Sequence, residues 1–304
     1  MSARRGATDL SGILAIDKPG GITSHDVVNR VRRITGERRV GHAGTLDPMA
    51  TGLLVVLVGP ATRLSSYLTA AEKAYEARIV FGTETDTDDA EGRVTATAGV
   101  PDEIGDPFFA TQTVASLVGT HQQIPPAYSA IKRGGVTAYE AARKGDALEL
   151  DARTIEVTGA RLLGVECLAE YAWDVEFEVS KGTYIRALAR DLGRALDSAA
   201  HLGALRRTRS GAMDVAQAHA LEQLESAADV RSLFVDPFAA LGLPVVSVGD
   251  TLAARLATGA TLADDAEGMV AVAHDGVLVG VYAGSMGMLK PLSVIPGGVT
   301  GGVQ

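Results

Sequence analysis

The segment 41–52, GHAGTLDPMATG, constrains the fold more than any other part of the sequence. Its three glycines allow backbone conformations that other residues avoid. Pro48 fixes its own φ and disfavours a helical conformation at Asp47. An apolar run, residues 53–58, follows at once and predicts a buried strand. We therefore expect Asp47 on a rigid, irregular loop beside a buried strand, a position suited to a catalytic carboxylate.

The composition is typical of a globular protein. The 304 residues, 46% apolar and 21% charged, are enough for one large domain or two unequal ones. No apolar run reaches the roughly 20 residues of a membrane span, and the N-terminus lacks the apolar core of a signal peptide. The single Cys167 excludes an internal disulfide and a cysteine-rich zinc site. We expect this cysteine to be buried and the chain to work in the cytoplasm.

The charge distribution matters more than the net charge of −9. Residues 1–70 hold nine Lys and Arg against five Asp and Glu, and residues 180–211 hold seven against two. Solvated helix faces would explain either stretch alone, but the two together predict a surface that binds phosphates. The candidate side chains are Arg30, Arg32, Arg33, Arg38, Arg39, Arg206, Arg207 and Arg209.

The hydrophobic pattern predicts interleaved helices and strands without a regular βαβ rhythm. We therefore expect an α+β fold with a mixed, mainly antiparallel sheet. Thr23 or Ser24 is suited to cap a helix with an apolar valine face. Residues 84–91 are interpreted as an acidic polar loop. Strands are expected at 11–17, 53–58, 73–81, 153–166 and 171–180, a helix at 184–196, and an extended basic segment at 202–213.

A domain boundary is predicted near residues 238–244. Residues 1–240 would form the larger domain. Beyond it, short apolar runs predict a small β-rich module over 244–295. The glycine-rich segment 296–304 is expected to be a flexible tail.

Four further residues, apart from the candidate phosphate contacts, are candidates for chemistry. Asp47 before a proline could simply shape a turn. Tyr75 in an alternating strand could pack, stack on a base or transfer a proton. Arg186 begins the helix after Ser180-Lys181-Gly182 and could be aimed at a carboxylate, whose pKa it would lower. Lys18 lies at a strand end before a turn.

Five ordered segments resemble the TruB family of bacterial tRNA pseudouridine synthases. They are Asp17-Lys18-Pro19-Gly20-Gly21-Ile22-Thr23-Ser24, residues 39–52, Lys73-Ala74-Tyr75, residues 124–132 and Lys181-Gly182-Thr183-Tyr184-Ile185-Arg186. The resemblance covers about residues 11–215. Thr45 stands where many relatives carry alanine, and residues 98–120 match loosely. The family's usual C-terminal domain is of the PUA type, an RNA-binding module, and residues 244–295 fit it in length.

The resemblance implies that the chain isomerises uridine 55 in the T-loop of tRNA to pseudouridine. Asp47 would be the catalytic carboxylate, attacking either C1′ of the ribose or C6 of the base. Tyr75 would stack on the uracil or remove the C5 proton, and Arg186 would pair with Asp47. Because the target lies in a folded loop, the nucleotide must be flipped out. By resemblance His42 would fill the vacated stack, Tyr184 and Leu205 would line the uracil pocket, and Lys18 would brace the loop or contact phosphate.

The resemblance implies no metal and no cofactor, in agreement with a sequence that has neither a metal-ligand motif nor a dinucleotide fingerprint. The expected partner is the T-arm of tRNA, with no membrane, and the chain is expected to be a monomer. Three other functions are kept open: an N-glycosidase that releases uracil, a non-catalytic RNA-binding protein, and a guide-RNA-dependent synthase in a ribonucleoprotein.

Overall fold

The computed structural model describes residues 8–146, 148–256 and 258–302. The chain forms two compact units. The first unit comprises Met1–Ala71 with Arg207–Gln304, and the second comprises Glu72–Arg206. This division differs from the expected one, because residues of the C-terminal module, such as Val281 and Ile295, share a hydrophobic core with Ile13 and Leu57 of the N-terminal part.

The first unit is built on strand β3 (Thr51–Val58), whose residues 52–58 are all buried. It pairs antiparallel with β1 (Gly12–Lys18) and with β2 (Val40–His42). The last residues of β12 (Ala200–Ser210) also belong to this unit. The smaller elements are η1 (Gly59–Leu64), α2 (Ser65–Ala70), β13 (Met213–Asp214), η3 (Val215–Gln217), α6 (Leu221–Ser226), η4 (Val230–Leu233), β14 (Phe234–Val235) and α7 (Pro237–Leu241).

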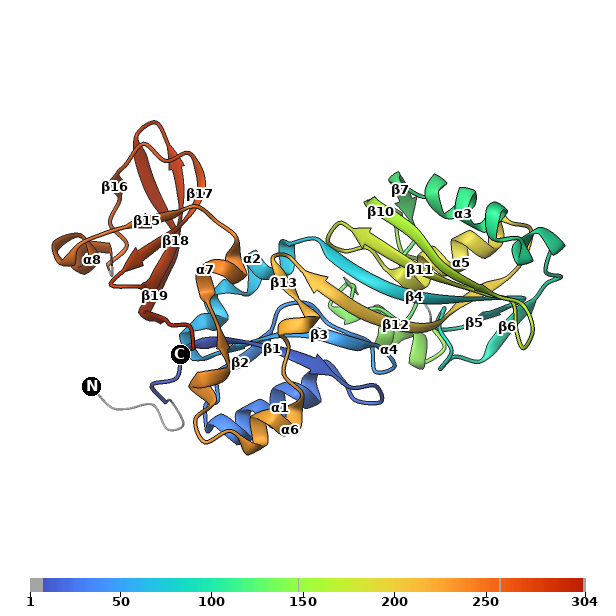
Figure 1. The fold of residues 1–304 in the computed structure, drawn as a ribbon, viewed down its shortest axis with the longest axis horizontal. Helices are drawn as coiled ribbons and strands as arrows, with labels where there is room; N and C mark the ends of the chain where they lie inside the picture. The colour runs from blue at the N-terminus through green and yellow to red at the C-terminus, as the bar shows by residue number, and fades with distance from the viewer. Residues whose placement is uncertain (1–7, 147, 257, 303–304) are drawn as a thin grey trace. The chain divides into compact units, whose positions relative to one another are not determined.

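Helix α1 (Ser24–Thr35) follows the turn after β1 and lies beside α6 (Figure 1). Thr23 caps its N-terminus in a capping box with Asp26, as its sequence predicts. Gly36 ends the helix in the left-handed conformation. Its valine face is buried, which leaves the arginine side toward solvent.

The C-terminal module of the first unit is a five-stranded sheet in the order β15-β17-β18-β19-β16. The strands are β15 (Val245–Ser247), β16 (Leu262–Ala263), β17 (Gly268–His274), β18 (Val277–Ser285) and β19 (Met288–Val299), with helix α8 (Asp250–Leu256).

The prediction of a flexible tail at 296–304 is wrong for residues 296–302. The segment 296–299 belongs to β19, and the amide of Gly302 donates to the carbonyl of Phe234 at 2.8 Å. Residues 303 and 304 lie outside the described residues.

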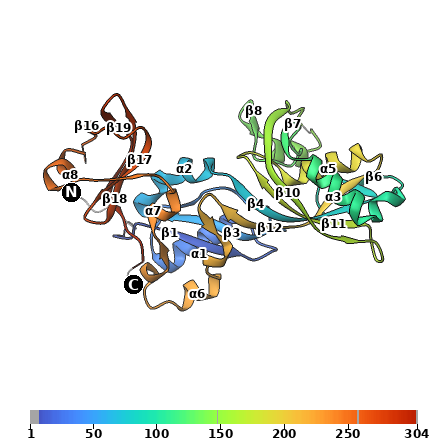
Figure 2. The ribbon, with the colours of Figure 1, turned by 45° about the horizontal axis from the view of Figure 1, so that its top comes forward.

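The second unit is an antiparallel sheet in the order β4-β11-β10-β7 (Figure 2). The strands are β4 (Lys73–Phe81), β7 (Gly119–Gln123), β10 (Arg153–Glu166) and β11 (Ala172–Val179). Helix α3 (Pro107–Ser116) packs on β10, and α5 (Ile185–Ala195) packs near β4. The remaining elements are β5 (Thr83–Thr85), β6 (Val94–Thr97), η2 (Asp102–Gly105), β8 (Lys132–Arg133), β9 (Val136–Thr137) and α4 (Ala138–Arg143).

The core of the second unit surrounds Trp173, which is fully buried. Its indole donates to the carbonyl of Ile104 at 2.8 Å, and its ring meets Phe81 edge-on. Cys167, expected to be buried, is exposed in the bend between β10 and β11. The expected α+β class with a mainly antiparallel sheet is confirmed. Over the described ranges, no helix has both the length and the apolar character to cross a membrane.

Candidate functional site

Asp47 lies half-buried on an irregular loop, residues 43–50, between β2 and β3. The residue before it is held by Ser24, the first residue of α1. The Ser24 hydroxyl accepts from the amide of Leu46 at 2.9 Å and donates to the carbonyl of Leu46 at 3.0 Å. One buried hydroxyl thus satisfies both polar groups of the residue that precedes the carboxylate.

The residue after Asp47 is held by Lys18. The Lys18 side chain is 0% exposed, and its ammonium donates to the carbonyls of Pro19 at 2.9 Å, Ile22 at 2.7 Å and Pro48 at 3.2 Å. A buried ammonium needs such partners, because desolvation without them is very costly. Of the two roles expected for Lys18, the structure therefore supports bracing of the loop.

Arg207 contacts the same loop from β12. Its guanidinium donates to the carbonyls of Leu53 at 2.6 Å, Gly44 at 3.1 Å and Thr45 at 3.4 Å. The residue is only 1% exposed. This placement disagrees with the phosphate contact expected for Arg207, because the guanidinium is turned into the protein and not toward solvent.

His42, the last residue of β2, lies half-buried at the start of the loop. Burial lowers the pKa of its imidazole below the usual value, and the positive charges of Arg207 and His25 lower this pKa further. Its Nδ1 has no hydrogen-bond partner among the described residues. The imidazole is therefore neutral at pH 7, which suits contact with an uncharged base.

The second unit carries the other expected site residues. Tyr75 lies on β4 opposite Phe177 of β11, with only 9% of its surface exposed. Leu205 is buried on β12. Tyr184 occupies the N-cap position of α5. The side-chain amide of Gln123 accepts from the N–H of Tyr184 at 2.9 Å and donates to its carbonyl at 3.1 Å.

Arg186 lies in the first turn of α5 and is buried. Its guanidinium donates to the carbonyls of Thr87 at 2.8 Å and Tyr128 at 3.0 Å, and lies 3.5 Å from the carboxylate of Asp89. The guanidinium is thus anchored within its own unit. The pairing of Arg186 with Asp47, a residue of the first unit, stays a prediction.

One turn further along α5, Arg190 pairs with Asp88 at 2.8 Å and donates to the carbonyl of Ile124 at 2.8 Å. Burial raises the pKa of Asp88 and the charge of Arg190 opposes the rise. Another turn along, Arg194 binds Glu84 and holds the pKa of that carboxyl below its usual value.

The sequence predicted a polar loop at 84–91 but not these ion pairs, and it predicted neither the contacts of Ser24 with Leu46 nor those of Gln123 with Tyr184. One signal was available. Arginines at 186, 190 and 194 share one helix face, and a run of acids precedes them in the chain.

The remaining arginines lie nearer to solvent. Arg33, Arg38 and Arg39 are exposed, and Arg30 is half-exposed, 3.8 Å from Glu225. Arg32 donates to the carbonyl of Val40. The two half-buried arginines Arg206 and Arg209 flank Arg207 on β12.

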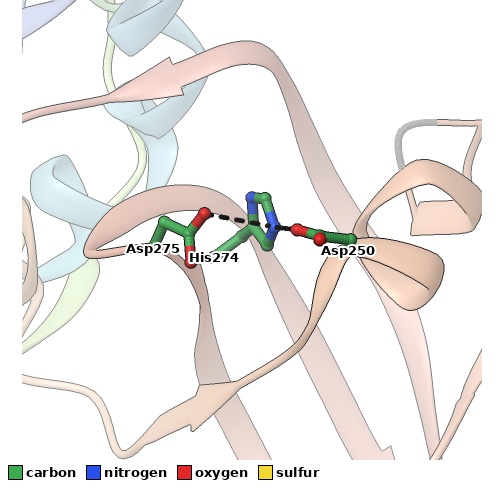
Figure 3. Close-up of side chains that lie close together, drawn as sticks. All are labelled: Asp250, His274 and Asp275. Atoms are coloured by element: carbon green, nitrogen blue, oxygen red, sulfur yellow. Dashed lines mark hydrogen bonds and ion pairs between the residues drawn. The ribbon is translucent and has the colours of Figure 1, made fainter.

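Among the described residues, Asp250, His274 and Asp275 bring potential metal ligands together (Figure 3). The His274 Nε2 lies 2.9 Å from Asp250 and 3.7 Å from Asp275. The two carboxylates are 93% and 83% exposed, so this is an imidazole held between surface acids.

Comparison with known proteins identifies the family. Residues 32–185 match the family model "TruB family pseudouridylate synthase (N terminal domain)", and residues 186–233 match "tRNA pseudouridylate synthase B C-terminal domain". The chain belongs to the TruB family.

Several relatives of this chain carry the name tRNA pseudouridine synthase B. The protein from Thermobifida fusca is 44% identical over 94% of this chain and 99% of its own length. The protein from Arthrobacter sp. is 42% identical over 94% of this chain and 96% of its own length. The protein from Corynebacterium aurimucosum is 46% identical over 82% of this chain and 83% of its own length. A solved chain in an H/ACA RNP bound to a substrate RNA containing 2′-deoxyuridine is 25% identical, with a TM-score of 0.69 over 93% of this chain and 84% of its own.

The buried ammonium of Lys18 gives a first prediction. Lys18→Met leaves the carbonyls of Pro19, Ile22 and Pro48 without that donor, so we expect the free energy of unfolding to fall by about 3 kcal/mol. Urea unfolding measures the change. The matched control is Lys290→Met, which removes an exposed lysine and should change stability by less than about 0.5 kcal/mol. Equal effects of the two substitutions would contradict the bracing role.

The lowered pKa of His42 gives a second prediction. Between that pKa and the ordinary histidine value of about 6.5, the unfolded chain binds more protons than the native chain. Stability from His42 is therefore present above pH 6.5 and is lost as the pH falls through this window. Urea unfolding from pH 7.5 to 5.5 should show a smaller loss for His42→Phe than for the wild type. Identical pH slopes in the two proteins would be inconsistent with a buried, neutral His42.

Proposed function

We propose that this chain is a tRNA pseudouridine synthase that isomerises uridine 55 of the T-loop. Relatives named tRNA pseudouridine synthase B support the substrate, since they align over nearly the whole chain at more than 40% identity. The observation that carries the proposal is the Asp47 loop. A half-buried carboxylate is displayed there on irregular backbone, with the neighbouring peptides held by the buried side chains of Ser24 and Lys18.

Asp47 is the proposed catalytic carboxylate. It acts either as nucleophile or as electrostatic partner of the sugar while the base is detached at nitrogen, turned and rejoined through C5. Attack at C1′ of the ribose and attack at C6 of the base are both compatible with this role. Arg186 is proposed to pair with Asp47, and Tyr75 to stack on the uracil and assist removal of the C5 proton. The C1′–N1 bond is exchanged for a C1′–C5 bond, and the proton that leaves C5 is balanced by one that N1 gains, so the net reaction is an isomerisation that needs no external reductant or oxidant.

His42, Tyr184 and Leu205 are proposed to receive the flipped nucleotide. Extrusion of a base costs a few kcal/mol of stacking. A neutral imidazole at position 42 can offset part of this cost by stacking where the base was, without burying a charge. The ring of Tyr184, whose peptide is held on both sides by Gln123, and the side chain of Leu205 offer apolar surface to the uracil.

The RNA backbone is proposed to lie along the exposed arginines of α1 and the segment after it. Arg30, Arg33, Arg38 and Arg39 are suited to phosphate contacts, as are Arg206 and Arg209, whereas the T-loop is recognised by its shape and unstacked bases. The PUA-like module at 244–295 is proposed as a further RNA contact. It carries Arg255 and Lys290 against five acidic residues, so we expect its contacts to involve few phosphates. Because the substrate is tRNA, the proposed location is the cytoplasm, with the chain acting as a monomer.

The test is to incubate the protein with an unmodified tRNA transcript and to map pseudouridine. We expect product at position 55 alone, without added guide RNA and without free uracil. Asp47→Asn is nearly isosteric and should reduce the single-turnover rate by at least about 1,000-fold while RNA binding changes little. Release of free uracil would indicate the N-glycosidase instead. A requirement for a second RNA would indicate the guide-dependent synthase, and full activity of Asp47→Asn would contradict the role of the carboxylate.

The arginine surface predicts a steep salt dependence of RNA binding. The logarithm of the binding constant should fall linearly with the logarithm of salt concentration, and Arg33→Met or Arg39→Met should each reduce the slope by roughly one. Arg161→Met is the control, because Arg161 lies on β10 in an exposed pair with Glu176. A flat salt response in the wild type would remove this role for the arginines.

A further inference from the structure

We propose that Arg207 is a positioning residue for the catalytic loop and not a phosphate contact. It acts through backbone carbonyls on both sides of Asp47, so that its guanidinium sets the path of the loop that displays the carboxylate. This inference rests on the proposed function, in which Asp47 carries the chemistry.

The contacts of Arg207 lie at the entry and at the exit of the loop. Gly44 and Thr45 precede Asp47, and Leu53 is the first residue of the fully apolar part of β3 after it. A single planar group donates to all three carbonyls. The fork geometry of a guanidinium makes this possible, because its donors point in several fixed directions at once.

The backbone of Arg207 also packs closely against the end of the loop, at Gly52. Gly52 has a φ of +96°, and a Cβ placed on it would lie 2.3 Å from the Arg207 carbonyl oxygen and 2.8 Å from the Arg207 nitrogen. The loop exit therefore rests directly on the main chain of β12 at this residue. Side chain and main chain of Arg207 together fix where the loop rejoins β3.

An apolar residue could not replace Arg207, because the buried loop needs hydrogen-bond donors at this position. Irregular backbone leaves carbonyls without helix or sheet partners, and a buried carbonyl without a donor is destabilising. Arg207 supplies these donors to Gly44 and Thr45, and the carbonyls in turn offset the desolvation of the guanidinium. The alternation along β12 separates it from its neighbours: Leu205 and Arg207 are buried, whereas Arg206 is half-exposed.

The consequence is a specific kinetic signature. A loop displaced by about 1 Å can cost 10²-fold in rate without loss of substrate binding. Removing Arg207 should therefore lower the rate at saturating enzyme and leave RNA affinity nearly unchanged. A phosphate contact would give the opposite result, with weaker binding, a smaller salt slope and an unchanged saturating rate.

The experiment compares Arg207→Met, Arg207→Lys and Arg206→Met with the wild type. Single-turnover pseudouridine formation at 55 gives the rate at saturation. RNA affinity is measured at several salt concentrations in the Asp47→Asn background, so that no turnover occurs, and circular dichroism at the assay temperature establishes that each variant is folded. Arg161→Met controls for the loss of an arginine elsewhere on the surface.

We expect Arg207→Met to lower the saturating rate by about 100-fold and Arg207→Lys by about 10-fold, with RNA affinity within about threefold of wild type. Arg206→Met should weaken binding and reduce the salt slope. The lysine variant keeps the charge but not the fork, so it decides the question if the methionine variant fails to fold. A folded Arg207→Lys protein with wild-type rate and affinity would overturn the proposal, as would weakened binding of Arg207→Met at an unchanged saturating rate. If the wild type makes no pseudouridine at 55, the proposed function fails instead.

Discussion

The first unit depends on one constraint: the backbone carbonyls of an irregular, partly buried loop must find donors outside regular secondary structure. Lys18 and Arg207 supply them as buried cations, and Ser24 supplies a hydroxyl. Each reaches the loop from a different element, β1, β12 and α1. The loop can therefore be rigid and irregular at once, which is what a displayed carboxylate such as Asp47 requires.

In the second unit, too, buried arginines supply hydrogen-bond donors to backbone carbonyls. Arg186 and Arg190 are buried on α5. The first guanidinium binds two backbone carbonyls and the second binds one, each together with a carboxylate from the loop after β5. Arg190 also pairs with its chain neighbour Asp191, at 2.8 Å. These pairs orient α5, whose N-cap residue is Tyr184, so one of the residues proposed to receive the base is positioned by a helix that buried ion pairs hold in place. Because these groups are already ordered before the substrate reacts, the reaction step does not include the free-energy cost of ordering them.

Local patterns predicted the parts of the fold that local physics controls. Apolar periodicity placed β3, β4, β10 and β11, the cap at Thr23 placed α1, and the Gly-Pro composition placed Asp47 on an irregular loop. Long-range partners were not predictable in this way. The run Arg206–Arg209 looks like a basic surface, and only the burial of Arg207 in the structure shows that it turns inward, toward residues more than 150 positions away in the chain. The glycine-rich end at 296–302 was likewise misjudged, because pairing with β18 and a bond to Phe234 order it.

We expect the Asp47 loop to be fixed before RNA binds. Amide hydrogen exchange of the RNA-free protein tests it directly, because the amide of Leu46 is bonded to Ser24 and the amide of Ala43 to the carbonyl of Val55. We expect both amides to be strongly protected from exchange without RNA, and an unmodified tRNA transcript to add little further protection. Exchange of both amides at the rate of unstructured chain, with protection gained only on RNA binding, would contradict it.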